Sequence, residues 1–281
     1  ALTTNDTLIV AFAFKITDTR QYTKIMSMFD GSSRGMGIGY AIDGELRVYR
    51  GDTWMTSTYG AEIREDTWYY LQYKVKCHNT TGTYELKIND TTVISMSGID
   101  TKVGANDYHD RVRFGRINQT VDFYIDDFSV CDGSGSVNND FIGNTRIVML
   151  NPDGDDTANW GTVSPGPNHF DAVNEDEADD DTSYVQDSTT TITDLYDYEA
   201  LPTLGDIVGI QTNTDCRDTD GTPFDLITPI ESNSSQYDDS AQTIGTTDYV
   251  TLIRVAEADP DTGNAWTEAG LNAAKFGVKV G

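Results

Sequence analysis

Carboxylates are the residues of this chain best able to do chemistry, because 46 Asp and Glu residues stand beside three His and three Cys. A retaining glycoside hydrolase needs two carboxyl groups about 5–5.5 Å apart. Asp122 and Asp126 share one face of an expected strand, VDFYIDDFSV, because side chains alternate along a strand. No Glu accompanies them there, so polysaccharide hydrolysis is the weakest of the functions considered below.

The other catalytic residue types form no motif. His78, His109 and His169 lie far apart, and the Cys77–His78 pair has no further ligands at zinc spacing. The sequence has no nucleophile elbow and no Walker pattern. The glycine-rich stretch RGMGIGYAIDG (34–44) lies between expected strands and not before a helix, so it is not a nucleotide loop. We therefore expect no catalytic residues and no enzyme activity.

Closely spaced acidic residues offer oxygen ligands for calcium. Asp153 and Asp155 lie in NPDGDD, and the run NEDEADDD (174–181) follows. Neither segment has the EF-hand spacing, and a solvated acidic loop is the alternative interpretation. Calcium is the one ligand of this kind that the sequence suggests, and no organic cofactor is expected.

Aromatic side chains in or near expected loops are candidates for binding a ligand. Trp54, Tyr59 and Tyr108 are such residues. Aromatic rings in these positions could stack on sugar rings, and packing at the rim of the fold or in an interface is the alternative.

Composition excludes several classes of partner. The chain has 281 residues and a formal net charge of −27, which disfavours binding to nucleic acid or to anionic membranes, because both need clustered Lys and Arg. No apolar run approaches the ~18 residues of a membrane span. The odd number of cysteines, Cys77, Cys131 and Cys216, leaves at least one thiol without a partner in the chain.

Strand patterns dominate the elements that must position these residues. Asp43-Gly44 and Asn89-Asp90 each separate two strand-like segments, which predicts two hairpins. Strands are expected over LIVAFAFKI (8–16), KIMSMFDG (24–31), TWYYLQYKVK (67–76), RVRFGRI (111–117) and VDFYIDDFSV (121–130). Their order predicts an antiparallel meander, and their spacing predicts a β-sandwich.

The chain is expected to contain two β domains. Residues 1–132 form the first sandwich, 133–202 a junction and long acidic arm, and 203–281 a second, smaller β-sandwich. In the middle part, RIVML (146–150) is expected as a strand and Asn151–Asp197 as a loop. A short helix is expected within WTEAGLNAAKF (266–276), before the closing strand GVKV.

Three segments carry a resemblance to a known fold family. The strand TWYYLQYKVK, the hairpin YELKINDTTVISMSGIDT and the strand VDFYIDDFSVCD resemble, in this order, the concanavalin A-like, laminin G-like jelly roll. The continuation DDFSVCDGSGSVNNDFIGNTRIVMLNPDGDDTANWG and the ending DPDTGNAWTEAGLNAAKFGVKV are similar to a family of tailed-phage virion proteins, which couple such a domain to a second β domain. Asp126-Asp127, the turn Asn138–Gly143 and Trp266-Thr267 are its best motifs.

The resemblance implies an all-β fold and suggests further expectations. Lectin-type members often hold calcium at the rim of the sandwich, so Asp126 and Asp127, on the corresponding strand, become candidate metal ligands. Contacts across the strands or within a turn are the alternative role of these two residues. Hydrolases of the family carry Glu-x-Asp-x-x-Glu on one strand, which this sequence lacks. Members usually begin with strands before the segment matching TLIVAFAFKI, so the first sandwich is expected to lack its first strands and to expose an edge.

The sequence thus favours a non-enzymatic structural protein of a tailed-phage virion, such as a capsid decoration, a spike or a tail-associated adhesin. Its expected location is the outer surface of the virion. Its expected partners are other virion proteins and copies of itself, with a homotrimer as one arrangement. The alternative is a lectin-like module that binds host-surface glycan. Neither nucleic acid nor membrane insertion is expected.

Overall fold

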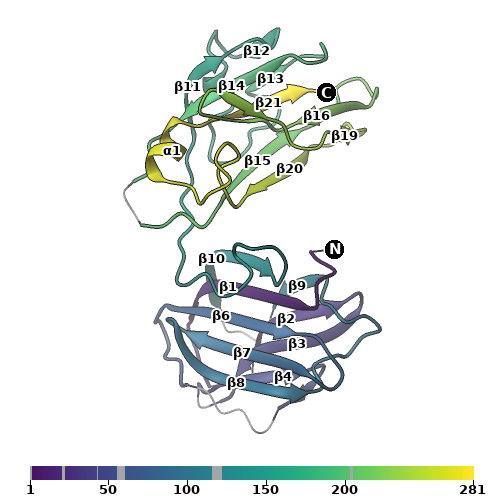
Figure 1. Ribbon diagram of the computed structural model, residues 1–281, viewed down its shortest axis with the longest axis vertical. Helices are drawn as coiled ribbons and strands as arrows, with labels where there is room; N and C mark the ends of the chain where they lie inside the picture. The colour runs from purple at the N-terminus through teal and green to yellow at the C-terminus, as the bar shows by residue number, and fades with distance from the viewer. Residues whose placement is uncertain (1, 21–22, 43, 56–60, 116–121, 203–204) are drawn as a thin grey trace. The chain divides into compact units, whose positions relative to one another are not determined.

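A computed structural model describes residues 2–20, 23–42, 44–55, 61–115, 122–202 and 205–281. Contacts within the chain divide it into two units, Ala1–Ile147 and Val148–Gly281. Each unit consists mainly of antiparallel strands (Figure 1). The all-β prediction is therefore confirmed. The helix α1 (Glu268–Ala273) has six residues, and no helix in the described part of the chain is long and apolar enough to span a membrane.

Unit 1 contains two five-stranded sheets. The first sheet has the order β10-β1-β6-β7-β8, and the second sheet has the order β5-β4-β3-β2-β9. The strands of the first sheet are β1 (Thr7–Ile16), β6 (Tyr69–Lys76), β7 (Gly82–Ile88), β8 (Thr91–Ile99) and β10 (Phe123–Asp132). Those of the second sheet are β2 (Thr23–Asp30), β3 (Ser33–Tyr40), β4 (Leu46–Arg50), β5 (Thr53–Trp54) and β9 (Arg111–Phe114).

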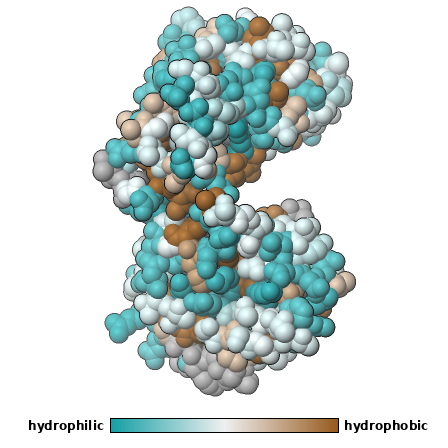
Figure 2. All heavy atoms as spheres, in the orientation of Figure 1, coloured by the Kyte–Doolittle hydropathy of each residue, from teal (hydrophilic) through white to brown (hydrophobic). Residues whose placement is uncertain are grey.

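The two sheets of unit 1 share one hydrophobic core. Phe12 of β1 and Leu71 of β6 are fully buried in the same cluster as Met26 of β2, Ile38 of β3 and Val48 of β4. Figure 1 shows β6, β7 and β8 in front of β2, β3 and β4. This two-sheet antiparallel sandwich is the architecture that the concanavalin A-like resemblance implies. Figure 2 shows a largely hydrophilic surface over this front sheet, as the high net charge leads one to expect.

The expected meander is wrong in one respect. The chain does not add each strand beside the previous one, because β1 lies between β10 and β6 and pairs with both. The long strand LIVAFAFKI is apolar on both faces, which suits an inner position covered on each side. β1 is thus an inner strand of the first sheet.

Residues 133–147, here called the covering segment, lie over the outward face of the first sheet. The Gly143 N–H donates to Gln72 Oε1 at 3.1 Å, and the Ile147 N–H donates to Asp127 Oδ1 at 2.8 Å. The ring of Phe141 lies 4.7 Å from Lys74 Nζ and 4.1 Å from Lys87 Nζ. These contacts account for the complete burial of Gln72, a polar residue on that face.

Unit 2 contains a seven-stranded sheet, a two-stranded ribbon and a small hairpin. The sheet consists of β11 (Pro152–Thr157), β14 (Thr193–Tyr198), β16 (Phe224–Ile227), β17 (Ile230–Ser232), β18 (Ser235–Tyr237), β19 (Gln242–Ile244) and β21 (Lys275–Val280). The ribbon pairs β15 (Ile210–Cys216) with β20 (Val250–Ala256), and the hairpin pairs β12 (Thr162–Ser164) with β13 (Tyr184–Gln186).

Trp266 and Thr267 explain the short helix that the sequence predicts. The Trp266 side chain is buried in a cluster with Leu271 and Phe276. Thr267 precedes the first residue of α1, and its Oγ1 accepts a hydrogen bond from the Gly270 N–H at 3.0 Å. Such an N-cap satisfies a backbone donor that has no partner within the helix.

Two predictions for the middle of the chain are wrong. Residues 146–150, all of them described, form no strand. The segment expected as a loop, Asn151–Asp197, contains β11, β12, β13 and most of β14. Its strands are hard to predict because β11, PDGDDT, has no large apolar residue and pairs with β14 at the edge of the sheet.

A buried carboxylate fixes this polar segment to the sheet. Asp194 of β14 is fully buried and accepts hydrogen bonds from the Asn159 and Trp160 N–H groups at 2.6 and 2.8 Å. Its other oxygen lies 2.6 Å from His169 Nδ1 and 3.3 Å from the Tyr196 hydroxyl. Hydrogen bonds to one side chain thus hold two separate parts of the segment, at Asn159–Trp160 and at His169, to β14.

Replacement of this carboxylate tests that role. Asp194→Ala is expected to lower the free energy of unfolding of unit 2 by about 3 kcal/mol, because buried donors would lose a charged acceptor. The matched control is Asp153→Ala, at an exposed residue of β11, with an expected change within about 0.5 kcal/mol. Urea unfolding of both variants measures the difference. Equal stability of the two variants would contradict the assignment.

Candidate functional site

A row of side chains crosses the outward face of the second sheet of unit 1. Direct register partners form this row, one on each strand: Trp54, Tyr49, Gly37, Ser27 and Arg113. A neighbouring row, Val48, Ile38, Met26 and Phe114, points into the core. Because successive side chains of a strand alternate, the first row points away from the core.

Glycines at every second position of β3 shape this face. Gly35, Gly37 and Gly39 alternate with residues whose side chains enter the core. A Cβ atom at Gly37 would lie 2.4 Å from the Tyr49 ring, one at Gly39 2.7 Å from the Trp54 ring, and one at Gly35 2.3 Å from His109 Nε2. Three rings therefore lie directly on the backbone of β3, in space that any other residue would fill.

Tyr49 forms the rigid centre of the face. Its hydroxyl donates to the Met26 carbonyl at 2.7 Å and lies 2.5 Å from Ser27 Oγ, which must then be the donor. Its ring meets that of Trp54 edge to face, with centroids 5.5 Å apart. Burial raises the pKa of Tyr49 to about 12, so the phenol is neutral near pH 7.

Charged groups surround these rings. Lys24 Nζ lies 4.5 Å from the centre of the Tyr49 ring and donates to Asp52 Oδ1 at 2.8 Å. Arg34 Nη1 donates to the same oxygen at 2.5 Å. The hydrogen bond from Lys24, with that from Arg34, lowers the pKa of Asp52. Arg47, opposite Gly39, pairs with Glu45 at 3.1 Å.

A second group of cations lies at the other end of the row. Phe29 is buried on the outward face, with the guanidinium carbons of Arg34, Arg111 and Arg113 at 5.9, 5.4 and 5.2 Å from its ring centre. Each distance is within the range of a cation–π contact. The face as a whole is thus aromatic in its floor and basic around it.

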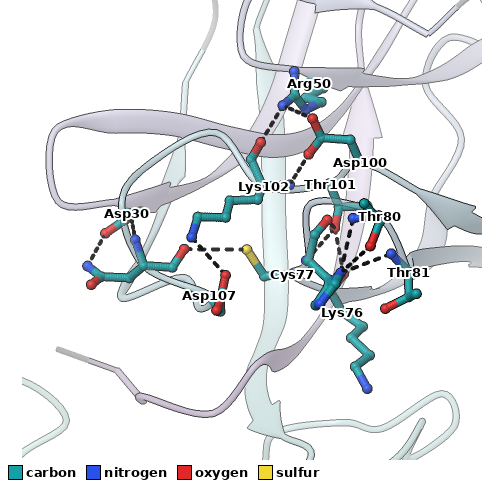
Figure 3. A network of polar contacts seen from close by, with 12 residues as sticks. Asp30, Arg50, Lys76, Cys77, Thr80, Thr81, Asp100, Thr101, Lys102 and Asp107 are labelled. Atoms are coloured by element: carbon teal, nitrogen blue, oxygen red, sulfur yellow. Dashed lines mark hydrogen bonds and ion pairs between the residues drawn. The ribbon is translucent and has the colours of Figure 1, made fainter.

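The loop between β8 and β9 is held in place by the polar network of Figure 3. The Thr101 hydroxyl donates to the Lys76 carbonyl at 2.6 Å and accepts from the His78 N–H at 3.0 Å. Arg50 Nη2 donates to Asp100 at 2.6 Å, and Lys102 Nζ donates to Asp107 at 2.8 Å. This loop carries His109 onto Gly35 and leads directly into β9.

His109 is a buried polar group beside the arginine cluster. Its side chain is nearly inaccessible, and Nδ1 has no hydrogen-bond partner among the described residues. Burial lowers the pKa of His109 to about 4, although Asp30 and Asp110 oppose this shift. The imidazole is therefore neutral near pH 7.

The structure separates the aromatic candidates of the sequence analysis. Trp54 lies on the outward face of the second sheet, partly exposed. Tyr108 lies in the loop before β9, next to His109. Tyr59 lies outside the described residues.

Asp126 and Asp127 lie on β10, at an irregularity in its pairing with β1. Asp127 has a φ of +51° and uses Oδ1 to accept from the Ile147 N–H, while Asp126 Oδ1 accepts from the Asp127 N–H at 2.8 Å. Both line a shallow hollow of about 240 Å³ beside Trp68 and Tyr70. Asp127 thus anchors the end of the covering segment, and Asp126 caps the backbone of Asp127.

Asp153 and Asp155 belong to unit 2, so the sequence candidates for calcium fall in different units. Asp155 accepts from the His169 and Phe170 N–H groups at 3.0 and 2.7 Å, at the start of a 3-10 turn. Asp153 is an exposed residue of β11. Among the described residues, no three His, Cys, Asp or Glu side chains group as metal ligands.

The basic part of the face was not predicted from the sequence. Arg111 and Arg113 alternate with Val112 and Phe114 in RVRF, a pattern that predicts two basic side chains on one face of a strand. The alternating glycines of RGMGIGY were the other available signal, since a glycine in a strand marks a close approach. The sequence around Phe29 does not indicate a role in the site, because the arginines that surround its ring come from β3 and β9.

Comparisons with known proteins show distant likeness to solved structures. No protein-family model matches the chain, and no curated protein matches it in sequence. An alginate lyase is 14% identical, with 46% of this chain and 70% of that chain covered and a TM-score of 0.35. An endo-β-1,4-glucuronan lyase from Trichoderma reesei is 13% identical, with 44% and 68% covered and a TM-score of 0.34. A galectin from Caenorhabditis elegans is 10% identical, with 47% and 87% covered and a TM-score of 0.33. Scores of this size establish neither a shared activity nor a shared ligand.

The close approach at Gly37 gives a direct test of the face. Gly37→Ala is expected to lower the free energy of unfolding by about 1–3 kcal/mol, because the new Cβ would overlap the Tyr49 ring and the Met26 carbonyl. Gly115→Ala is the control, since nothing lies within 4 Å of a Cβ there. Urea unfolding measures both, and a Gly37→Ala protein as stable as the control would refute the packing described.

The low pKa of His109 predicts a pH dependence of stability. As the pH falls from about 6.5 to about 4, the unfolded His takes up a proton and the folded one does not, so stability is lost at about 1.4 kcal/mol per pH unit. His109→Gln removes this loss. The unfolding free energy of the unchanged protein should therefore fall relative to that of His109→Gln as the pH is lowered across this range. A difference that stays constant with pH would count against a buried neutral imidazole.

Proposed function

We propose that unit 1 is a non-catalytic carbohydrate-binding sandwich whose site is the outward face of its second sheet. The observation that carries the proposal is Trp54, a partly exposed indole fixed edge to face on Tyr49, directly above Gly39. An aromatic ring that is already ordered can stack on the apolar face of a sugar with little further loss of conformational entropy.

The polar groups around the rings fit the same ligand. Lys24, Arg34 and Arg47 bring N–H donors to the face, and Asp52 brings carboxylate acceptors. Sugar hydroxyl groups both donate and accept, so a mixed set of this kind orients them. A few charged groups around an aromatic floor are typical of small-molecule sites.

The state of the titratable groups favours binding over catalysis. The Tyr49 proton is already donated to the Met26 carbonyl, and the phenol is fully buried. Asp52, which pairs with Lys24 beside the Tyr49 ring, accepts hydrogen bonds from both Lys24 and Arg34. A general acid or base must reach the reacting atom in a plausible pose, and these groups are engaged within the protein.

The sequence resemblance adds the proposal that the chain is a structural protein of a tailed-phage virion. A virion adhesin would combine both roles, with unit 1 contacting host-surface glycan and other surfaces contacting copies of the chain or other virion proteins. Sedimentation velocity tests the assembly part: a defined oligomer, such as a trimer, supports it, and a monomer at all concentrations counts against it.

A glycan array with matched tryptophan variants tests the binding proposal. Trp54→Ala is expected to weaken binding at least tenfold, which corresponds to about 1.4 kcal/mol. Trp68→Ala, at an exposed tryptophan just before β6 of the first sheet, should bind as the unchanged protein does. Absence of binding to every glycan, or equal losses in the two variants, would overturn the proposal. The same array with a chelator tests calcium, and we expect binding to persist.

A further inference from the structure

Three guanidinium groups converge on one ring of the second sheet of unit 1. Phe29 of β2 is the direct register partner of Arg34 on β3 and of Arg111 on β9. Arg113 lies two residues further along β9, on the same face, and is closest to the ring at 5.2 Å. Two strands, β3 and β9, therefore hold these cations around a ring from β2, the strand between them.

Within the described residues, one carboxylate alone forms an ion pair with this cluster. Arg34 shares the single carboxylate of Asp52 with Lys24, and Arg111 donates to the Gly31 carbonyl. Arg113 contacts the Phe29 ring, and none of the ion pairs among the described residues includes it. The chain has 46 acidic and 19 basic residues, so an exposed arginine without a carboxylate is unexpected here. Like charges held this close repel, unless an anion is bound.

The geometry points to an acidic glycan as the ligand of this face: we infer that Arg34, Arg111 and Arg113 around Phe29 bind its carboxylate or sulfate groups. The inference rests on the proposed carbohydrate-binding function. Guanidinium groups present paired N–H donors that match the oxygens of carboxylate and sulfate, and such charge-assisted bonds are stronger than neutral ones. A neutral sugar would leave this cluster uncompensated.

The distance across the sheet indicates an oligosaccharide. Trp54 and Arg113 are at opposite ends of one row that crosses five strands. Four strand spacings of about 4.8 Å give about 19 Å between them. A single sugar ring cannot reach both ends, so the ligand that uses stacking and charge together is a chain that runs across the strands.

The net charge of the protein limits which polyanions fit. At −27, the protein as a whole repels a polyanion, and attraction comes from the local cluster. The Debye length of about 10 Å at 0.1 M salt screens distant carboxylates more than groups in contact. Binding is therefore expected to persist at this salt concentration. The face has aromatic rings at Trp54 and Tyr49 and positive charges around Phe29. Sugar rings that carry acidic groups match this arrangement better than a continuous phosphate backbone does.

Isothermal titration calorimetry with a charge-matched pair of ligands tests the inference. The full chain is titrated with a short oligogalacturonate and with the same oligosaccharide methyl-esterified, which removes the charge and keeps the length. The acidic form is expected to bind at least tenfold more tightly. Arg113→Gln should remove this preference without weakening the neutral form, and Trp54→Ala should weaken both. The control Lys76→Gln, at an exposed residue of the first sheet, should change neither.

The outcomes separate this inference from the proposed function. Equal binding of both forms, or a preference that survives Arg113→Gln, would overturn the inference and leave carbohydrate binding intact. Binding of neither form, with a blank glycan array, would overturn both. A sulfated oligosaccharide titrated in parallel shows which anionic group the arginines prefer. A single-stranded oligonucleotide that binds as tightly as the oligogalacturonate would show that the ligand class is wrong.

Discussion

The absence of side chains at three alternating positions of β3 is the constraint on which the candidate site depends. Gly35, Gly37 and Gly39 allow His109, Tyr49 and Trp54 to lie on the strand itself. A larger residue would lift these rings and break the hydrogen bond from Tyr49 to the Met26 carbonyl. The floor of the face is thus set by packing against backbone, which makes it rigid, and the flexible charged side chains are arranged around that floor.

The two outward faces of the sandwich in unit 1 are used differently. The covering segment occupies the face of the first sheet, where Lys74 pairs with Asp140 and Phe141 lies between two lysines. The face of the second sheet carries Lys24 and several arginines around aromatic rings. In an acid-rich chain, this concentration of basic groups is a local exception. A local charge of this kind gives selectivity for an anionic ligand without giving general affinity for polyanions.

The sequence was informative where one face of a strand is apolar. The alternating strands of unit 1, the hairpin at Asn89-Asp90 and the helix after Thr267 are confirmed, because burial, turn and cap each leave a local pattern. Polar β11 left no such pattern, since Asp194 holds this region through hydrogen bonds instead of apolar packing. The inner position of β1 could not be predicted from local patterns either, because its pairing with β10 joins residues more than a hundred positions apart.

Part of the candidate site could be predicted from the sequence. Trp54 could be chosen as an exposed aromatic residue, and RVRF shows two basic residues on one face of a strand. Their convergence on Phe29 depends on the register between β2, β3 and β9, which no local pattern encodes. Asp126 and Asp127 attracted attention as carboxylates, yet the bond from the Ile147 N–H gives Asp127 a structural role.

The tryptophan indole resonances give the most direct measurement of the central claim, that the outward face of the second sheet binds glycan. The chain has four tryptophans, Trp54, Trp68, Trp160 and Trp266, and each contributes one indole N–H signal to a nitrogen–proton correlation spectrum. On titration of the full chain with an acidic oligosaccharide, the Trp54 signal should shift and the other three should stay. A shift of Trp68, Trp160 or Trp266 with Trp54 unchanged would contradict the account.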